Sequence, residues 1–341
     1  MTRISYIVCD HGLGHLRRAC LVACELKTLG LSVTIYSPIS NFQRLLRANP
    51  QFRDISCIPF HTNTSKQSIG GYQSPSAFLL SRLSCLPLAD IVVSDNLPDV
   101  LYLRPDAVIL AHFFWHDIFK LRTFFNGYLF SCDHILTLHR PTIIGSGLFA
   151  MPYVKRQAGF KHVGLFTDFN TEYARESYEK SLLITAGTTP MLRKTLLSVA
   201  CFIIRSKPIS LFKLYLDPDI YTTGMPTWVV AADYTISMFS RISIAICRPG
   251  LGIVSELLAR RIYILALHEL DNAEMYYNSV VLEQVGAGQR IPYPFDFEYI
   301  IELVYQRLSD KTVLSSDCAS LSFDGARETA HLIASMTKTS Y

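Results

Sequence analysis

The chain has 341 residues, of which 50% are hydrophobic and 18% are charged, and its formal net charge is +4 at neutral pH. Such a chain folds as a globular protein, and its length allows two domains because single hydrophobic cores stop growing at roughly 250 to 300 residues. The small net charge does not indicate a nucleic-acid partner, and no apolar run reaches the roughly 18 residues of a membrane span.

Cysteine usage and the first residues predict where the protein resides. The nine cysteines are scattered without a Cys-x-x-Cys pair, which favours buried, reduced thiols. Met1, Thr2 and Arg3 lead directly into an apolar run and form no signal-peptide pattern. We therefore expect a cytoplasmic protein.

The chain begins with a predicted β-α-β unit. Residues 4–9 and 31–36 are apolar runs typical of buried parallel strands, and residues 16–29 between them have helical spacing. A glycine turn joins the first strand to the helix, at the position where α/β sheets bind ligands. The residues of interest in this turn are Asp10, Gly12, Gly14 and His15.

His15 is the candidate general base of this turn. It stands at the start of a helix, where the positive end of the helix dipole disfavours the imidazolium and favours a neutral imidazole near pH 7. Asp10 is a weaker candidate, which would orient His15 or simply cap the turn. The alternative is a structural or solvated histidine, as isolated loop histidines usually are.

Short helices and strands continue to about residue 140, with a long polar loop at residues 61–76 of the kind that is often functional. Asp95 follows one predicted strand, where it would either edge a ligand site or cap a helix. The predicted helices are residues 41–48 and 78–86, and the predicted strands are residues 55–59, 91–93, 107–111 and 133–137.

An aromatic segment separates His112 from His116. Two histidines four apart on a helix can bind a metal, but here no glutamate accompanies them, so core packing or an acceptor-facing surface is favoured. Residues 119–130 predict an ordinary packed helix, with contact to a membrane surface as the alternative. Gly145 and Gly147 predict a loop.

A polar and charged stretch at residues 155–180 predicts a domain boundary. A strand at residues 181–185 and a helix extending to residue 204 follow it. Gly187, Thr188 and Thr189 join them, and their hydroxyls and free N–H groups suit phosphate oxygens. The next predicted elements are strands at residues 211–216 and 228–231 and a short helix at residues 234–239.

Residues 242–267 predict a second β-α-β unit, with strands at 242–247 and 262–267 around a helix at 253–259. Gly250 and Gly252 in its turn would let a diphosphate approach the helix N-terminus, and Glu256 one turn later would accept hydrogen bonds from a ribose. The alternative is a glycine turn of an ordinary α/β protein. Helices are also predicted at residues 297–308 and 325–338.

Two motifs resemble the GT-B nucleotide-sugar glycosyltransferases. The nearest resemblance is to the N-acetylglucosaminyltransferases that act on the peptidoglycan lipid intermediate and to related UDP-glycosyltransferases. The first motif is the Gly-x-Gly-His-x-x-Arg opening from Gly12 to Arg18. The second covers about fifty residues, and its matching positions are Arg248, Gly250, Ser255, Glu256, Glu274, Asn278, Leu282, Glu283, Gly286 and Gly288.

The resemblance implies two Rossmann-like α/β domains facing a cleft: an acceptor domain at residues 1–165, a donor domain at 166–325, and a terminal helix at 326–341 that packs back on the first domain.

The resemblance also implies a hexosyl- or N-acetylhexosaminyl-transferase that uses a nucleoside-diphosphate sugar, a UDP-sugar in the first place. His15 would be the base of an inverting reaction that needs neither a metal nor another cofactor. Diphosphate would lie on the two glycine turns. The implied donor-binding residues are Gly12, Gly14, Gly187, Thr188, Thr189, Arg248, Gly250, Gly252, Ser255, Glu256, Asp271, Asn272, Glu274 and Asn278.

The sequence constrains the acceptor and the other partners less than it constrains the donor. The resemblance leaves the acceptor open among a glycan, a lipid-linked molecule and a small molecule, and it leaves open a peripheral contact with the inner face of the membrane. Asp217 and Asp219 have the Asp-x-Asp spacing of a metal site, but they flank a proline in a predicted turn, so no metal is expected there.

One position departs from the family pattern. Met275 stands where the family has a glutamine that binds sugar hydroxyls, and Asp271 with Asn272 would have to supply that polarity. Two rival functions therefore stay open: a hydrolase like the UDP-sugar hydrolases of the pseudaminic acid pathway, with His15 activating water, and an inactive nucleotide-sugar-binding protein. An NAD-linked enzyme is disfavoured because the third glycine of Gly-x-Gly-x-x-Gly is absent after Gly14.

Overall fold

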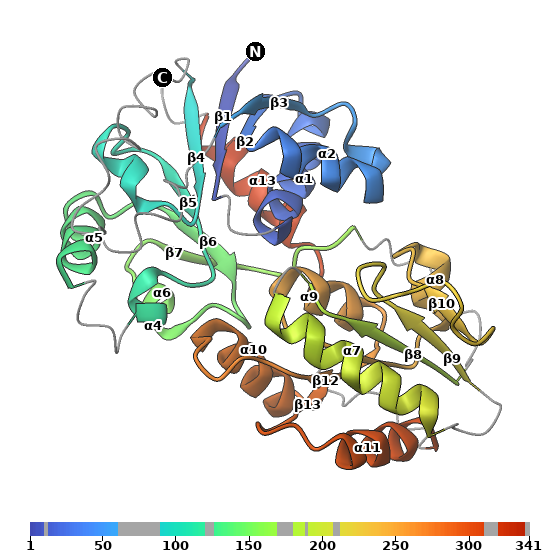
Figure 1. The fold of residues 1–341 in the computed structure, drawn as a ribbon. Coiled ribbons are helices and arrows are strands. Elements are labelled where there is room, and N and C mark those ends of the chain that lie inside the picture. The colour runs from blue at the N-terminus through green and yellow to red at the C-terminus, as the bar shows by residue number, and fades with distance from the viewer. Residues whose placement is uncertain are drawn as a thin grey trace. The chain divides into compact units, whose positions relative to one another are not determined.

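The structure, a computed structural model, describes residues 1–9, 13–60, 89–119, 126–168, 180–187, 190–206, 212–309 and 320–337. The chain divides into two compact units, and each contains one sheet with helices packed on it (Figure 1). The first unit comprises Met1–Thr167 and Ser322–Tyr341, and the second comprises Asp168–Leu321.

The sheet of the first unit has the strand order β3-β2-β1-β4-β5-β6-β7, and all its pairings are parallel. Its strands are β1 (Arg3–Val8), β2 (Ser32–Ser37), β3 (Ser56–Pro59), β4 (Ile91–Asp95), β5 (Val108–Leu110), β6 (Ile143–Ser146) and β7 (Phe160–Val163). The described helices of this unit are α1 (Leu13–Thr28), α2 (Ile39–Ala48), η1 (Pro50–Phe52), η3 (Pro98–Tyr102), α4 (Trp115–Phe119), α5 (Asn126–His139), α6 (Pro152–Lys155) and α13 (Gly325–Met336).

Both faces of this sheet are covered. Residues that alternate along the strands face opposite ways, so Tyr6 packs with α1, α2 and α13, whereas Ile7 packs with η3, α5 and α6. Helix α13 comes from the end of the chain, and its Ala330 and Ile333 enter the same core as Leu16 of α1 (Figure 1). The C-terminal helix therefore belongs to the fold of the first unit.

The chain reverses direction across this sheet between β1 and β4. From β1 it proceeds outward through β2 and β3, and it then returns to β4 on the other side of β1. Val8 and Asp95 are partners at the last register position of the two strands. The strands that follow β1 and β4 in the chain, β2 and β5, thus lie on opposite sides of this pair, and such a switch point is where open α/β sheets bind ligands.

The second unit repeats this design. Its parallel sheet has the order β10-β9-β8-β11-β12-β13, so its switch point lies between β8 and β11, where Thr185 pairs with Cys247. The strands are β8 (Lys180–Thr185), β9 (Phe212–Leu216), β10 (Val229–Ala231), β11 (Ile244–Cys247), β12 (Tyr263–Ala266) and β13 (Gly288–Arg290). The described helices are α7 (Pro190–Arg205), α8 (Ile236–Arg241), α9 (Leu251–Ala259), α10 (Ala273–Gln284) and α11 (Phe297–Ser309).

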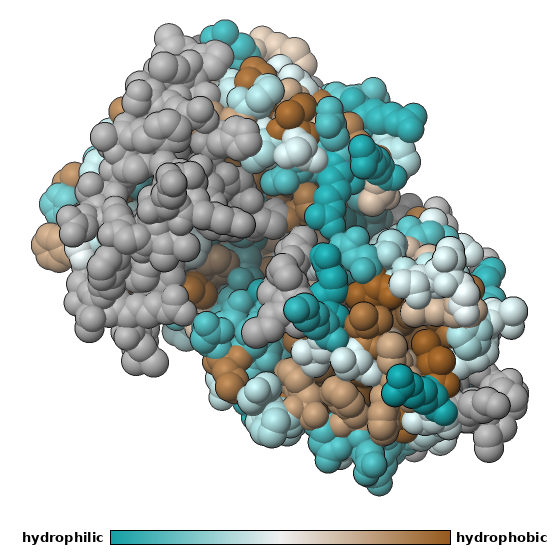
Figure 2. Space-filling model, in the orientation of Figure 1, coloured by the Kyte–Doolittle hydropathy of each residue, from teal (hydrophilic) through white to brown (hydrophobic). Residues whose placement is uncertain are grey.

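Helices α7 and α11 pack on this sheet through a core that includes Leu196, Leu216, Ile246 and Ile300. Figure 2 shows apolar surface on the second unit where α7 lies in Figure 1. Leu197 of α7 is 36% exposed. Partly exposed apolar side chains of this kind are common on protein surfaces and do not by themselves indicate a partner.

Two local predictions were wrong. Residues 133–137 lie within helix α5 rather than in a strand, because a short apolar run does not distinguish a strand from the buried side of a helix. Gly145 lies in strand β6 rather than in a loop; it is a glycine because a Cβ atom there would collide with the carbonyl oxygen of Ala111, the residue after β5. The stretch at residues 155–180, predicted as a domain boundary, contains strand β7 and, after it, the break between the two units at Thr167.

Other predictions fall on residues outside the described ranges, namely the loop at 61–76, the helix at 78–86 and residues 120–125 of the segment 119–130. The predicted boundaries at residues 165 and 325 compare with unit boundaries after Thr167 and Leu321. Within the described residues, no helix has both the length and the apolar character to cross a bilayer.

Candidate functional site

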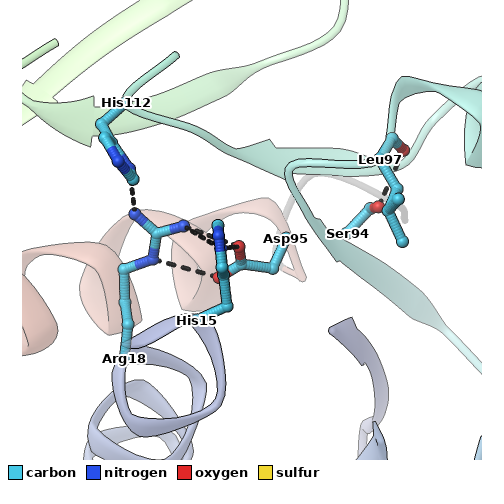
Figure 3. A network of polar contacts seen from close by, with 6 residues as sticks. All are labelled: His15, Arg18, Ser94, Asp95, Leu97 and His112. Carbon is cyan, nitrogen blue, oxygen red and sulfur yellow. Dashed lines mark hydrogen bonds and ion pairs between the residues drawn. The ribbon is translucent and has the colours of Figure 1, made fainter. Parts of the chain in front are cut away.

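His15 and Asp95 meet at the switch point of the first unit. His15 lies in the first turn of α1, directly after β1, and Asp95 is the last residue of β4 (Figure 3). His15 Nδ1 is 2.6 Å from Asp95 Oδ1, and the two side chains are 11% and 0% exposed. A contact this short with a carboxylate requires the proton on Nδ1, which leaves the lone pair of Nε2 to accept a proton.

Arg18 holds the other side of the Asp95 carboxylate. Its Nε donates to Oδ2 at 3.0 Å and its Nη2 donates to Oδ1 at 2.6 Å, which is the bidentate geometry of the strongest arginine–carboxylate pairs. Arg18 is one turn beyond His15 on α1, and its guanidinium carbon lies 5.7 Å from the centre of the Phe166 ring. The arginine is therefore buried and fixed from two sides.

His112 is the fourth member of this cluster. It follows β5, and its Nδ1 is 2.9 Å from Nη1 of Arg18 (Figure 3). Because arginine only donates, Nδ1 of His112 must be the acceptor, so a neutral His112 carries its proton on Nε2. The rings of His15 and His112 lie 6.1 Å apart at an angle of 28°.

Asp95 is ionised in this setting. Complete burial by itself would raise the pKa of the carboxyl group, but the charge of Arg18, the His15 imidazole and the hydrogen bonds from both lower it to about 2. The cluster thus combines a permanent carboxylate, a permanent guanidinium and a histidine that presents a basic nitrogen. This combination suits proton abstraction from a hydroxyl group or from water.

The two glycine turns of the second unit lie at its switch point. Gly187 follows β8 with a positive φ of 63°, which favours glycine, and Gly250 follows β11 as the N-cap of α9. The space where a Cβ atom would lie is open at both residues. Since β8 and β11 are neighbours, the N-termini of α7 and α9 lie at one edge of the sheet, and a helix N-terminus is a position that suits an anion.

Two charged residues predicted to bind the donor already have partners within the second unit. Nε of Arg248 lies 2.9 and 3.2 Å from the two carboxylate oxygens of Glu269, a buried residue just after β12. Glu256 is 6% exposed and forms an ion pair with Arg260, one turn later on α9. A ribose contact by Glu256, which stays a prediction, would have to share this carboxylate with Arg260.

Helix α10 supports the turn before α9. Asn278 is fully buried, and its Nδ2 donates to the carbonyl oxygen of Pro249 at 2.8 Å. Asn272 caps α10 by accepting from the N–H of Met275, whose side chain is only 2% exposed and belongs to the interior. The Met275 side chain is therefore packed in the interior of the second unit.

The other predicted donor-binding residues differ in their exposure. Ser255 is 1% exposed, Gly252 and Glu274 are half-buried, and Gly14 and Asp271 are exposed. Asp10, Gly12, Thr188 and Thr189 lie outside the described residues. Gly14 and His15 are in the first unit, whereas the described donor-binding residues from Gly187 to Asn278 are in the second unit.

The structure also contains a polar network that the sequence did not predict. The hydroxyl of Tyr234, a residue with a positive φ of 54° after β10, is 2.8 Å from Thr185 Oγ1 and 3.0 Å from Asp217 Oδ2. Asp217 also accepts from Thr185, and Asp219 pairs with Arg193. Asp217, which had the spacing of a metal site, thus ties together the ends of β8, β9 and β10.

Replacing Tyr234 with phenylalanine should destabilise the second unit by about 1–2 kcal/mol. The change removes a hydroxyl group that both donates and accepts, and it leaves buried oxygens of Thr185 and Asp217 with one partner fewer. Urea unfolding would measure the effect, with Tyr293→Phe as the control because Tyr293 is 58% exposed. Equal midpoints for the two variants would contradict the structural role of the network.

The sequence prediction did not select Arg18, His112, Glu269 and Tyr234 as candidate site residues, although Arg18 closes the Gly-x-Gly-His-x-x-Arg motif and His112 was considered as a metal ligand. It placed Asp95 at the possible edge of a site but did not select it. The signal that identifies them is shared: each lies just after a strand of a parallel sheet or one turn into the helix that follows. That position alone is weak evidence for a functional residue, because many polar residues there cap a helix.

Comparisons with known proteins identify solved structures with a similar fold. No protein-family model matches the sequence, and no curated protein sequence matches it significantly. A glycotransferase of kitacinnamycin has a similar structure, with 13% sequence identity, 98% of both chains covered and a TM-score of 0.69. The spinosyn rhamnosyltransferase SpnG is similar with 14% identity, 99% of this chain and 100% of that chain covered, and a TM-score of 0.66. UGT89C1 of Arabidopsis thaliana in complex with UDP is similar with 12% identity, 100% of this chain and 96% of that chain covered, and a TM-score of 0.61.

At these identities the similarity establishes the architecture. The chain has the α/β fold of the GT-B glycosyltransferases, with two Rossmann-like units, over essentially its whole length. SpnG has also been solved with thymidine diphosphate and with spinosyn aglycone.

Proposed function

We propose that this protein is a glycosyltransferase that moves a sugar from a nucleoside-diphosphate donor, a UDP-sugar in the first place, to a hydroxyl group of an acceptor. The observation that carries the proposal is the His15–Asp95 pair at the switch point of a GT-B unit. The other unit has two helix N-termini with open glycine turns at its own switch point, which suit a diphosphate.

In this proposal His15 is the base. Nε2 takes the proton of the acceptor hydroxyl group while the oxygen attacks the anomeric carbon, and the bond between that carbon and the diphosphate oxygen breaks. Asp95 holds the imidazole in the tautomer that leaves Nε2 free of a proton. One displacement of this kind inverts the anomeric configuration.

The diphosphate leaving group would be stabilised by the N–H groups that begin α7 and α9. Gly187 and Gly250 allow the backbone to come close, and Arg248 adds positive charge beside the turn while Glu269 keeps its guanidinium oriented. Developing negative charge is met by these groups, so the proposed reaction needs neither a metal ion nor another cofactor. Asn278 fixes the turn through the Pro249 carbonyl.

For the acceptor we propose a small hydroxylated molecule. The support is the full-length similarity to glycosyltransferases such as SpnG, which was solved with an aglycone. The sugar, whether a hexose or an N-acetylhexosamine, would be identified by the donor that gives turnover.

A nucleotide screen tests the donor proposal. We expect UDP or a UDP-sugar to raise the melting temperature, because a ligand at 100 times its Kd stabilises the fold by about 2.7 kcal/mol. GDP, dTDP and CMP serve as competitors for specificity. The Glu256→Ala variant should lose the shift if this carboxylate holds the ribose, and keep it if Glu256 serves only as the partner of Arg260. The absence of a shift with every nucleotide would contradict the proposal.

Turnover then separates transfer from hydrolysis. With the donor from the screen, sugar should pass to a library of hydroxylated acceptors faster than it is released to water. Release without acceptor at the same rate as any transfer would instead assign a hydrolase in which His15 activates water. Tight binding with neither reaction would assign a binding protein.

A further inference from the structure

The buried cluster around Asp95 has a charge balance that depends on Arg18. His15, Arg18, Asp95 and His112 are each at most 11% exposed. With both histidines neutral, one carboxylate offsets one guanidinium and the cluster has no net charge. A proton added to either histidine would give a buried site with a net positive charge, and this is costly in a protein interior.

The same cluster without Arg18 would behave in the opposite way. A buried carboxylate with a neutral histidine as its remaining partner would be a net negative site. Such a site favours uptake of a proton by the histidine, because the imidazolium then becomes the missing counter-ion. His15 bonds to Asp95 at 2.6 Å, so it is the histidine placed to take that proton.

We propose that Arg18 keeps His15 available as a base by neutralising Asp95, so that the carboxylate orients the imidazole without drawing a proton onto it. The inference rests on the proposed function, in which His15 is the catalytic base, and Arg18 is a positioning residue that acts through Asp95. Arg18 is built for this role, since it contacts both oxygens of Asp95 and also donates to His112 Nδ1, where a competing proton would otherwise bind.

The groups around the cluster are consistent with this charge balance. The hydroxyl of Tyr6 on β1 has a pKa well above its usual range because it is buried and lies near Asp95, and burial also raises the pKa of the Cys20 thiol on α1. Both groups are therefore neutral at physiological pH. Asp95 on β4 responds to Arg18 and His15, and Arg17 on α1 adds positive charge near Cys20.

The proposal also accounts for the reset of the base. During transfer the acceptor proton moves to His15, which becomes a cation. Its Nδ1 is 3.4 Å from Nη2 of Arg18. The neighbouring guanidinium disfavours this state. His15 thus returns its proton to solvent once the product has formed, and the cluster is again uncharged.

The first test needs no variant. A titration of the unmodified protein, followed by the imidazole resonances in nitrogen-15 NMR and assigned with His15→Gln, should show His15 neutral at pH 7 with its proton on Nδ1. A His15 that is protonated at pH 7 in the free protein would overturn the proposal. This measurement does not depend on turnover. A negative result would therefore contradict the inference about Arg18 without contradicting the proposed glycosyltransferase function.

The second test compares Arg18→Met with Arg18→Lys. The methionine variant should move the midpoint of His15 protonation, and with it the acid limb of the kcat/KM profile, upward by about 1–3 pH units, and lower kcat/KM at pH 7 about tenfold or more. The lysine variant keeps the charge and should leave the acid limb in place while lowering kcat through lost bidentate geometry. Arg17→Met, on the same helix, is the matched control and should change neither.

A double variant tests whether the unneutralised charge of Asp95 causes the shift in His15 protonation. Arg18→Met combined with Asp95→Asn removes both charges, so the acid limb should return toward its original position even though activity stays low. An unchanged His15 midpoint in Arg18→Met would overturn the inference and leave Arg18 with a structural role. If instead turnover survived in His15→Ala, the proposed function of His15 would fail while the titration still reported on Arg18.

Discussion

Replacing His15 with alanine should reduce glycosyl transfer about 10²- to 10⁴-fold and leave nucleotide binding intact. The loss is that of a general base, which contributes this factor when it is positioned at the proton it removes. Binding should survive because the glycine turns proposed to hold the diphosphate belong to the second unit, whereas His15 belongs to the first. Initial rates at saturating donor, together with the thermal shift by UDP, measure the two effects on the same preparation.

The matched control is His134→Ala, since His134 is an exposed histidine of α5 in the same unit. It should change neither the rate nor the shift. Turnover by His15→Ala within threefold of the original protein would contradict the assignment of the base. It would then direct the search to the other residues at the carboxyl edge of this sheet, beginning with His112.

Replacing Asp95 with alanine should destabilise the protein by about 3–5 kcal/mol as well as abolish transfer. Asp95 is fully buried and accepts three hydrogen bonds, two from Arg18 and one from His15, so its removal leaves a buried guanidinium without its counter-ion. Urea unfolding at pH 7 would measure the stability, and initial rates would measure the transfer.

The chain offers a matched control for this variant. Asp106 accepts two hydrogen bonds of 2.8 Å from Arg104 in a similar bidentate pair, but its side chain is 64% exposed. Asp106→Ala should therefore cost only about 0–1 kcal/mol, because solvent screens a surface pair. Equal losses for the two variants would mean that burial does not determine the energetics of the Asp95 pair.

The Asp95 pair also predicts a pH dependence. The pKa of Asp95 is lowered from 3.8 to about 2 in the folded protein. A carboxylate whose pKa is depressed by folding stabilises the native state above its unfolded pKa and loses that contribution as the pH falls through the folded value. Stability should therefore fall between about pH 4 and pH 2, and the fall should be smaller in Asp95→Ala. An identical acid transition in both proteins would contradict this.

The sequence could predict the alternation of strands and helices because the buried strands are short runs of β-branched residues and the helices have an apolar stripe. Residues 4–9, 181–185 and 242–247 were predicted as strands, and β1, β8 and β11 lie there. Glycine turns followed by helices predicted a β-α-β unit in each half, and the resemblance to the GT-B enzymes implied that each half is Rossmann-like. These are local properties, determined by backbone and side-chain preferences within a few residues.

The sequence could not predict which strands are neighbours. Strand β6 was missed because Gly145 is a local turn signal, whereas its place in the sheet depends on pairing with β5, more than thirty residues earlier. Helix α5 was mistaken for a strand because Ile135 and Leu136 are buried by the sheet they pack against, which no local pattern reveals.

By itself, the sequence determined that His15 follows a glycine turn after the first strand, that Gly187 and Gly250 occupy similar turns in the second half, and that the chain is an α/β protein with two Rossmann-like units. The tertiary structure alone decided the long-range partners, which are Asp95 for His15 and Arg18, and Glu269 for Arg248. The physical reason is that strand order brings the ends of β1 and β4, or of β11 and β12, together at one edge of a sheet. An ion pair between residues 77 positions apart depends on that order and not on spacing along the chain.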